Sequence, residues 1–166
     1  VCVGKNYVDN AKFEDVKKRI ESKEFEPVIP DYVHLEEYIK DGGYEVAKKI
    51  INGDISKKQV LYSLNESGLK GKGGAGFPTG KKWEIVNSYK GKKYVAVNGD
   101  EGEPGTFKDR SYLEKDPHRF LEGALIASSF INAYKVYIYI RDEYPAVIKI
   151  LNDEILKLEE KNIIPI

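Results

Sequence analysis

The chain has 166 residues, of which 27 are basic and 27 acidic, so its formal charge at pH 7 is zero. This balance offers no basic surplus for nucleic acid or an anionic membrane surface, and the single cysteine, Cys2, excludes an internal disulfide. The longest apolar stretch, residues 124–131, is too short to span a bilayer, so the composition indicates a cytoplasmic protein without direct membrane insertion.

Both ends of the chain indicate one segment of a longer polypeptide. The sequence contains no methionine with which translation could begin. Residues 163–166 read Ile-Ile-Pro-Ile, which is typical of another strand or of the approach to one. We therefore expect a fold that is truncated at its C-terminal end, with exposed apolar surface near residues 137–141.

The first half of the chain predicts short helices. Residues 1–3 suit the end of a strand, and a helix capped by Asp9 or Asn10 follows, with an apolar stripe that includes Phe13 and Ile20. A proline-containing connector leads to further predicted helices, each followed by a glycine that ends it. Their ranges are 32–40, 44–51 and 57–66, and Ser56 caps the last.

The second half alternates strands and helices. A glycine-rich stretch leads into a helix at 80–89, with Thr79 as its expected N-cap. The predicted elements that follow are strand 93–98, helix 117–132, strand 135–141 and helix 145–161. This order predicts a parallel, Rossmann-like βαβα unit with a right-handed crossover, and therefore an α/β fold. We divide the chain into a helical segment, 1–55, and the first half of an α/β domain, 56–166.

The glycine-rich stretch, residues 68–83, is suited to binding an anion. Glycine lets the backbone approach a ligand closely, and the following helix turns its positive dipole end and two lysines, Lys81 and Lys82, toward the loop. A phosphate is the anion that such a site favours, although a glycine-rich stretch can also be a plain connection. The spacing of Gly71, Gly73 and Gly76 fits G-x-G-x-x-G, but no strand precedes it, and the Walker pattern fails because Lys82 stands where Ser or Thr is required.

A second loop, residues 98–110, follows the first predicted strand and is acidic. Ligands of parallel sheets bind at the carboxyl ends of strands, which is where this loop begins. Its three carboxylates, Asp100, Glu101 and Glu103, suit hydrogen bonds from ligand hydroxyls and amides. A divalent metal site and a solvated acidic turn are the alternatives, while Asp109 and Arg110 suit structural ion pairs.

A phosphate site in one loop and carboxylates in the other suit a nucleotide-type cofactor. The carboxylates can hold ribose or ribityl hydroxyls, and Phe77 can stack on a heterocycle. These residues do not choose among FMN, NAD and another nucleotide.

The two loops together closely resemble the flavin-bearing, NADH-oxidising subunit of respiratory complex I and the related β subunits of NAD-linked [FeFe]-hydrogenases and formate dehydrogenases. The resemblance covers residues 32–150, which correspond to the N-terminal part of those subunits. It includes the Gly-rich loop, the sequence Asn-Gly-Asp-Glu-Gly-Glu-Pro-Gly-Thr-Phe-Lys-Asp-Arg at 98–110, and the strand at 137–141.

The resemblance implies an NADH:acceptor oxidoreductase in which hydride passes from NADH to FMN and electrons continue to iron–sulfur clusters. It implies FMN and NAD(H) as cofactors. The redox chemistry would then belong to the flavin, and no side chain would need to act as a general base. Glu101 and Glu103 would lie nearest the nicotinamide. The residues implied to hold FMN are Gly71, Gly73, Lys82, Asn98 and Asp100. The residues implied to hold NAD(H) are Gly74, Phe77, Lys82, Glu101 and Glu103.

The chain departs from the family pattern in several respects. Lys70 and Lys72 stand where arginines are commoner, Gly99 replaces an alanine, and Ile85 stands where some members have an aromatic ring. The Gly-Glu-Glu segment and the four cysteines of a four-iron cluster do not occur, so that cluster is expected only in a C-terminal part outside this chain. Cys2 is either a remnant of a two-iron, ferredoxin-like extension or an incidental thiol.

The family implies iron–sulfur partner subunits in a multisubunit complex, a complex I arm or a hydrogenase, and a peripheral position on the membrane through those partners. The missing cluster ligands leave an alternative, a non-catalytic nucleotide-binding or assembly segment of a redox complex. A nucleotide-binding regulator or transferase that uses the same loops is a third possibility.

Overall fold

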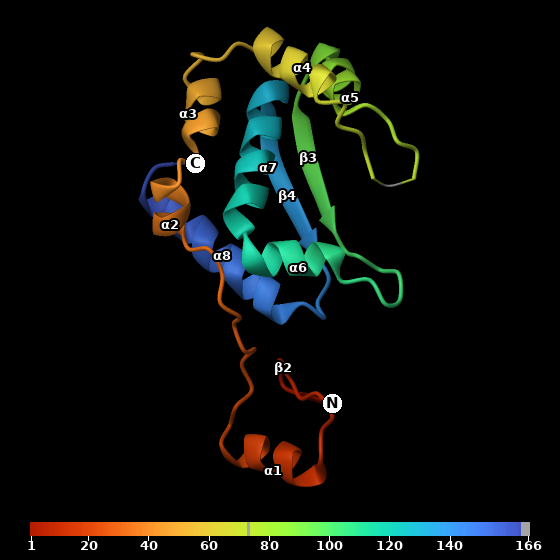
Figure 1. Cartoon of the computed structure of the whole chain (residues 1–166), viewed down its shortest axis with the longest axis vertical. Helices are drawn as coiled ribbons and strands as arrows, with labels where there is room; N and C mark the ends of the chain where they lie inside the picture. Colours follow the sequence, from red (N-terminus) through yellow and green to blue (C-terminus); the bar gives the residue numbers. More distant parts are fainter. Residues whose placement is uncertain (73, 164–166) are drawn as a thin grey trace.

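A parallel pair of strands lies at the centre of the main body of the molecule (Figure 1). The computed structural model describes residues 1–72 and 74–163. Strand β3 (Lys93–Gly99) pairs in parallel with β4 (Ala133–Ile140), in a register that runs to Gly99 opposite Ile140. The connecting helix α7 (Pro117–Ile131) packs on one face of this pair. The predicted parallel βαβα order and α/β class are therefore confirmed.

Half-buried and exposed side chains alternate along the two strands, so one face of the pair is apolar and is covered by α7. Val95, Val136 and Ile138 are half-buried, as the period of two in a strand with one covered face requires. The other face carries Tyr94, Tyr137 and Tyr139, each more than half exposed. The exposed apolar surface expected near residues 137–141 consists of the rings of Tyr137 and Tyr139.

The remaining helices of the main body surround α7. Helices α2, α3 and α8 pack with it around a core that includes Leu35, Tyr44, Val147 and Leu151, and α4 and α5 pack at its other end around Val60 and Phe130. The division of the chain at residue 55 stays a prediction. The bounds are α2 (Leu35–Lys40), α3 (Glu45–Ile51), α4 (Lys57–Glu66), α5 (Thr79–Ser88), α6 (Lys108–Lys115) and α8 (Pro145–Glu160).

The N-terminal residues form a small lobe that an extended connector joins to the main body (Figure 1). A two-stranded antiparallel hairpin, β1 (Cys2–Val3) and β2 (Asn6–Tyr7), precedes helix α1 (Phe13–Glu21). The lobe contacts the main body through the Tyr7 hydroxyl, which donates a hydrogen bond of 2.8 Å to the backbone carbonyl of Glu143.

Several local predictions need correction. Helix α1 has Lys12 as its N-cap, rather than Asp9 or Asn10. The chain is still in a turn at Asn10, whose φ of 49° is left-handed, so the helix begins after it. Helix α5 begins at Thr79 with Pro78 as its N-cap, because the Pro78 carbonyl accepts the first helical hydrogen bond, from the Lys82 N–H at 3.1 Å. Helix α6 was not predicted at all, since its residues lack an apolar period.

Other boundaries are confirmed or nearly so. Ser56 caps α4 through the Gln59 N–H, and Asp116 caps α7 through the Arg119 N–H. Helix α8 matches the prediction to one residue at its end. Within the described residues, no helix is both long enough and apolar enough to cross a membrane.

Candidate functional site

The glycine-rich stretch forms a loop that is closed at its base. The Thr79 N–H donates to the Leu69 carbonyl and the Gly71 N–H to the Phe77 carbonyl, both at 2.9 Å. Gly76, with a φ of 60°, has the left-handed conformation that glycine adopts at little cost. The closed base places the loop directly before the first turn of α5, from which it projects (Figure 1).

A hollow of about 280 Å³ lies against this loop and brings together three predicted site residues, Gly71, Phe77 and Lys82. Phe77 is 46% exposed, so much of its ring is open to a ligand. The hollow is therefore open, carries a cation and lies at a helix N-terminus, where backbone N–H groups favour anions. Gly74 lies in the same exposed loop, whereas Gly73 lies outside the described residues.

The acidic loop is held by its own short hydrogen bonds. The Asn98 side-chain oxygen accepts from the Asp100 N–H at 3.0 Å, which makes a local turn directly after β3. The Thr106 hydroxyl donates to the Glu103 carbonyl at 2.5 Å. Asp100 is half-buried and Glu103 is exposed, so the two carboxylates differ in their access to solvent.

Glu101 differs from both because its carboxylate caps helix α6. Oε1 accepts from the Asp109 N–H at 2.8 Å, while Oε2 accepts from the Arg110 N–H at 3.1 Å and the Tyr144 hydroxyl at 3.3 Å. Burial would raise the pKa of Glu101, but these donors stabilise the ionised form and hold the pKa below its ordinary value. A carboxylate accepts about four hydrogen bonds, so these three leave room for one more, at Oε1.

Two residues that the sequence did not single out, Arg141 and Tyr144, follow the second strand of the parallel pair and also contact Glu101. The Arg141 guanidinium donates to the Glu101 carbonyl at 3.0 Å and to both carboxylate oxygens of Glu143 at 3.1 and 2.8 Å. This double contact holds the pKa of Glu143 at about 2. Arg141 directly follows β4, and Tyr144 lies in the same short connection to α8, so the rule that ligands bind at the carboxyl ends of strands could have identified both.

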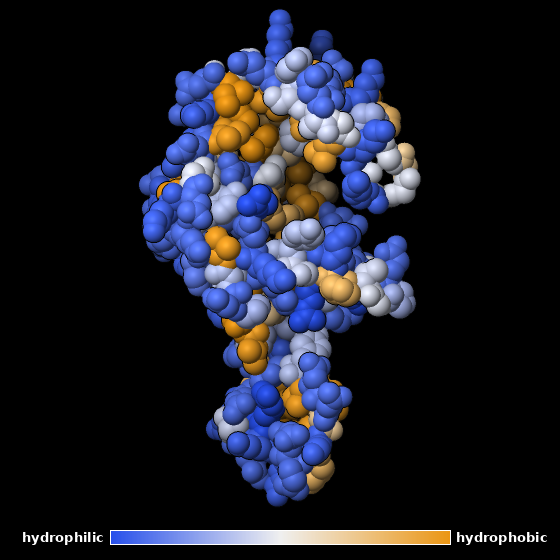
Figure 2. Space-filling view, in the orientation of Figure 1, coloured by the Kyte–Doolittle hydropathy of each residue, from blue (hydrophilic) through white to orange (hydrophobic). Residues whose placement is uncertain are grey.

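The two loops project from the same side of the molecule. Both lie on the β3 side of the sheet in Figure 1, and Figure 2 shows a recess between the two projections. The predicted ion pairs of the acidic loop are confirmed, since Lys108 pairs with Asp109, and Arg110 pairs with Glu114 at 2.9 Å. No group of three or more His, Cys, Asp or Glu residues that could hold a metal ion occurs in the described residues, so the metal alternative for this loop has no ligand set there.

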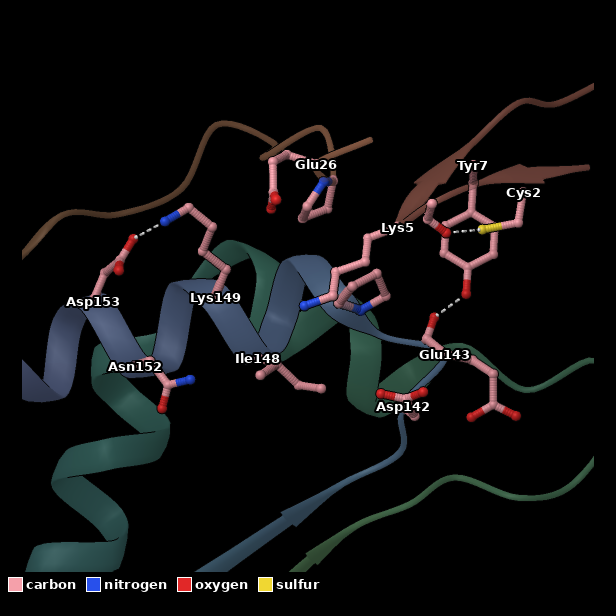
Figure 3. A pocket seen from close by; sticks show the side chains of 13 residues that line it. Cys2, Lys5, Tyr7, Glu26, Asp142, Glu143, Ile148, Lys149, Asn152 and Asp153 are labelled. Carbon is pink, nitrogen blue, oxygen red and sulfur yellow. Dashed lines mark hydrogen bonds and ion pairs between the residues drawn. The ribbon is translucent and has the colours of Figure 1, made fainter. Parts of the chain in front are cut away.

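A larger hollow, about 460 Å³, lies elsewhere, between the N-terminal hairpin and the start of α8 (Figure 3). Cys2, the free cysteine, lines it and donates a hydrogen bond of 2.8 Å to the Gly4 carbonyl. Lys149, also in the lining, pairs with Asp153 at 3.1 Å. Because no described residue of either loop lines this larger hollow, we favour the smaller hollow at the glycine loop as the candidate site.

Comparison with known proteins is consistent with this choice. Residues 64–166, which include both loops, match the family described as Nuo51 FMN-binding domain. The F subunit of the NADH-quinone oxidoreductase of Aquifex aeolicus is 48% identical over 127 residues, which cover 76% of this chain and 29% of that protein. Its counterpart in Escherichia coli is 43% identical over 114 residues, which cover 68% of this chain and 25% of that protein.

A solved structure resembles nearly the whole chain. The crystal structure of an NAD⁺-reducing [NiFe]-hydrogenase in the H₂-reduced state superposes with a TM-score of 0.69 at 26% identity. The match covers 92% of this chain and 29% of that chain. The chain therefore spans about a third or less of the proteins it resembles.

Proposed function

This chain belongs to the family of the Nuo51 FMN-binding domain, and we propose that it is the FMN- and NAD(H)-binding segment of an NADH dehydrogenase-type flavoprotein subunit. The observation that carries the proposal is the hollow at the glycine loop, where Phe77 and Lys82 meet at the start of α5 within the matched region. The parent protein would be an NADH:acceptor oxidoreductase.

The residues present fit a flavin nucleotide. Its phosphate needs cations and N–H donors, which Lys82 and the first turn of α5 supply on an open surface. Its ribityl chain needs acceptors, which Asp100 provides from the end of β3. The adenine ring of NAD(H) needs an exposed aromatic surface, which Phe77 offers.

We assign the residues in two groups. Asn98 would act chiefly by shaping the loop, because its side-chain oxygen already accepts from the Asp100 N–H. Glu101 would present its remaining acceptor site, whereas the exposed Glu103 is free to turn toward a ligand. The FMN group is Gly71, Gly73, Lys82, Asn98 and Asp100. The NAD(H) group is Gly74, Phe77, Lys82, Glu101 and Glu103.

The chain contributes binding and orientation rather than acid–base chemistry. When bound, FMN supplies the oxidation of NADH by hydride transfer and the release of electrons one at a time to iron–sulfur clusters. Lys82 would bind the negatively charged phosphate, and Phe77 would restrict the orientation of the nucleotide by stacking on its base. The acidic loop would orient hydroxyl and amide groups, so that the reacting rings meet in one geometry.

The same proposal extends to the assembly. Iron–sulfur subunits of a multisubunit oxidoreductase would accept the electrons, and a four-iron cluster would be carried outside the residues of this chain. The protein would lie in the cytoplasm, peripheral to the membrane through those partners.

The test is the replacement Lys82→Ala in the flavin-binding protein, with Lys58→Ala as the matched control on the exposed surface of α4. A lost hydrogen bond between charged groups typically costs about 1.5–3 kcal/mol, so FMN and NADH affinity should fall about tenfold to a hundredfold. Fluorescence titration with FMN and NADH-dependent dye reduction measure the two effects. Unchanged affinity for both would remove Lys82 from the site. A wild-type protein that binds FMN yet reduces no dye would favour the non-catalytic alternative.

A further inference from the structure

Arg141 connects the carboxyl ends of the two parallel strands. It follows β4 directly, and its Nη1 donates at 3.0 Å to the carbonyl of Glu101, in the loop that follows β3. The other side of the guanidinium is fixed by Glu143 through two hydrogen bonds. The Tyr7 hydroxyl of the N-terminal hairpin donates to the Glu143 backbone, which restrains this turn from the far side. The direction of Nη1 is therefore set by three elements of the fold.

Tyr144 makes the second contact with the same residue. Its hydroxyl donates to Glu101 Oε2 at 3.3 Å, and the residue is 9% exposed. The guanidinium groups of Arg110 and Arg141 lie 5.6 and 5.4 Å from the centre of its ring. Cations at such distances from an aromatic face are attracted to it, so the ring and both arginines hold one another in place.

Glu101 needs such restraint because its backbone is strained. Its φ of 48° is left-handed, a conformation that residues other than glycine adopt at an energetic cost. Arg141 holds the carbonyl of this residue, and Tyr144 and the α6 N–H groups hold its carboxylate. Because Glu103, in the NAD(H) group, follows Glu101 closely, its direction depends on this conformation.

We propose that Arg141 and Tyr144 are positioning residues for NAD(H): by holding Glu101 they set the direction of the acidic loop, without touching the nucleotide themselves. The inference rests on the proposed function for its ligand. Its structural half, that Arg141 and Tyr144 restrain the loop, can be measured without any ligand.

The first measurement is amide hydrogen exchange on the protein without FMN. The Asp109 and Arg110 N–H groups donate to Glu101, so their exchange reports the position of its carboxylate. Arg141→Lys keeps the positive charge but loses the planar guanidinium, which bonds Glu101 and Glu143 at the same time. We therefore expect these two amides to exchange about tenfold faster. The control is Arg119→Lys, which changes an exposed arginine paired with Asp116 at 2.8 Å.

The second measurement is steady-state kinetics of the FMN-loaded protein. We expect the KM for NADH to rise about tenfold in Arg141→Lys, with kcat and FMN affinity within about twofold of the wild type. Arg141→Gln should raise the KM further. Tyr144→Phe keeps the ring between the arginines and removes one hydrogen bond, so it should give a smaller rise.

Three outcomes decide the matter. If Arg141→Lys behaves like Arg119→Lys in exchange and kinetics, the proposal is overturned. If the KM, kcat, FMN affinity and unfolding midpoint all worsen together in Arg141→Lys and Tyr144→Phe, the two residues are merely structural. If the wild type binds neither FMN nor NADH, the proposed function fails, and the exchange measurement still decides whether Arg141 holds the loop.

Discussion

A buried ionic network centred on Glu154 allows a sharp prediction about stability. Glu154 lies on α8 and is fully buried, as is His118 on α7, whose Nε2 is 2.9 Å from Glu154 Oε2. The other carboxylate oxygen accepts from the Tyr32 hydroxyl at 2.8 Å and from Lys157 at 2.7 Å. An ionised carboxylate can only accept, so His118 donates through Nε2, and its Nδ1 accepts from the Tyr44 hydroxyl at 2.9 Å.

Replacing Glu154 by leucine should lower the free energy of unfolding by about 2–5 kcal/mol, because the donors of His118 and Tyr32 lose their shared acceptor. The His118 N–H would remain buried without an acceptor, which accounts for about 1–3 kcal/mol of this loss. Domains are typically stable by ~5–15 kcal/mol, so the loss would be large. Glu154→Gln should cost less, because the amide keeps the volume and His118 can exchange its tautomer to accept from it.

The network also predicts how stability depends on pH. Burial lowers the pKa of His118, so its contribution is present above about pH 6.5 and is lost as the pH falls through its folded value. Burial would raise the pKa of Glu154, but the hydrogen bonds from Lys157 and Tyr32 outweigh it and lower the pKa. Its contribution is therefore lost as the pH falls below about 4.5. Glu154→Leu should flatten the pH dependence in that acid range.

Urea unfolding followed by circular dichroism at pH 7, and at steps down to about pH 3, measures both effects. The control is Glu159→Leu on the same helix, where the side chain is exposed and the change should stay within about 0.5 kcal/mol. A loss in Glu154→Leu no larger than that of the control would refute this account. So would strict additivity of Glu154→Leu and His118→Leu, since residues in contact should be coupled.

Three further predictions each concern a single residue. Glu103→Gln should raise the KM for NADH more than it lowers flavin content, and loss of flavin with normal NADH binding would reverse that assignment. Gly123→Ala should stabilise the protein by about 0.5–1 kcal/mol, because a Cβ there meets no heavy atom within 4 Å in the described residues; unchanged or lower stability in urea unfolding would contradict it. Asp116→Ala should cost about 1 kcal/mol through the lost cap on α7, whereas Asp116→Asn should retain most of that stability.

Local signals in the sequence determined most of the elements and the two loops. The apolar period of α8 and the β-branched and aromatic run of β4 depend on neighbours along the chain, so both were predicted within one or two residues. The glycine loop was identified by its chemistry alone, and the structure places Gly71, Phe77 and Lys82 around one hollow.

What the sequence could not determine depends on residues far apart in the chain. Arg141 and Glu101 are separated by 40 positions, and Tyr44 and His118 by 74, so no periodicity relates them. The charge of Glu154, taken alone, would assign it to solvent, although the period of α8 places position 154 on the buried stripe of the helix. Tertiary structure buries it instead, because the donors from α7, α8 and the connector before α2 compensate the cost of removing its charge from water. Only the folded chain brings those donors together.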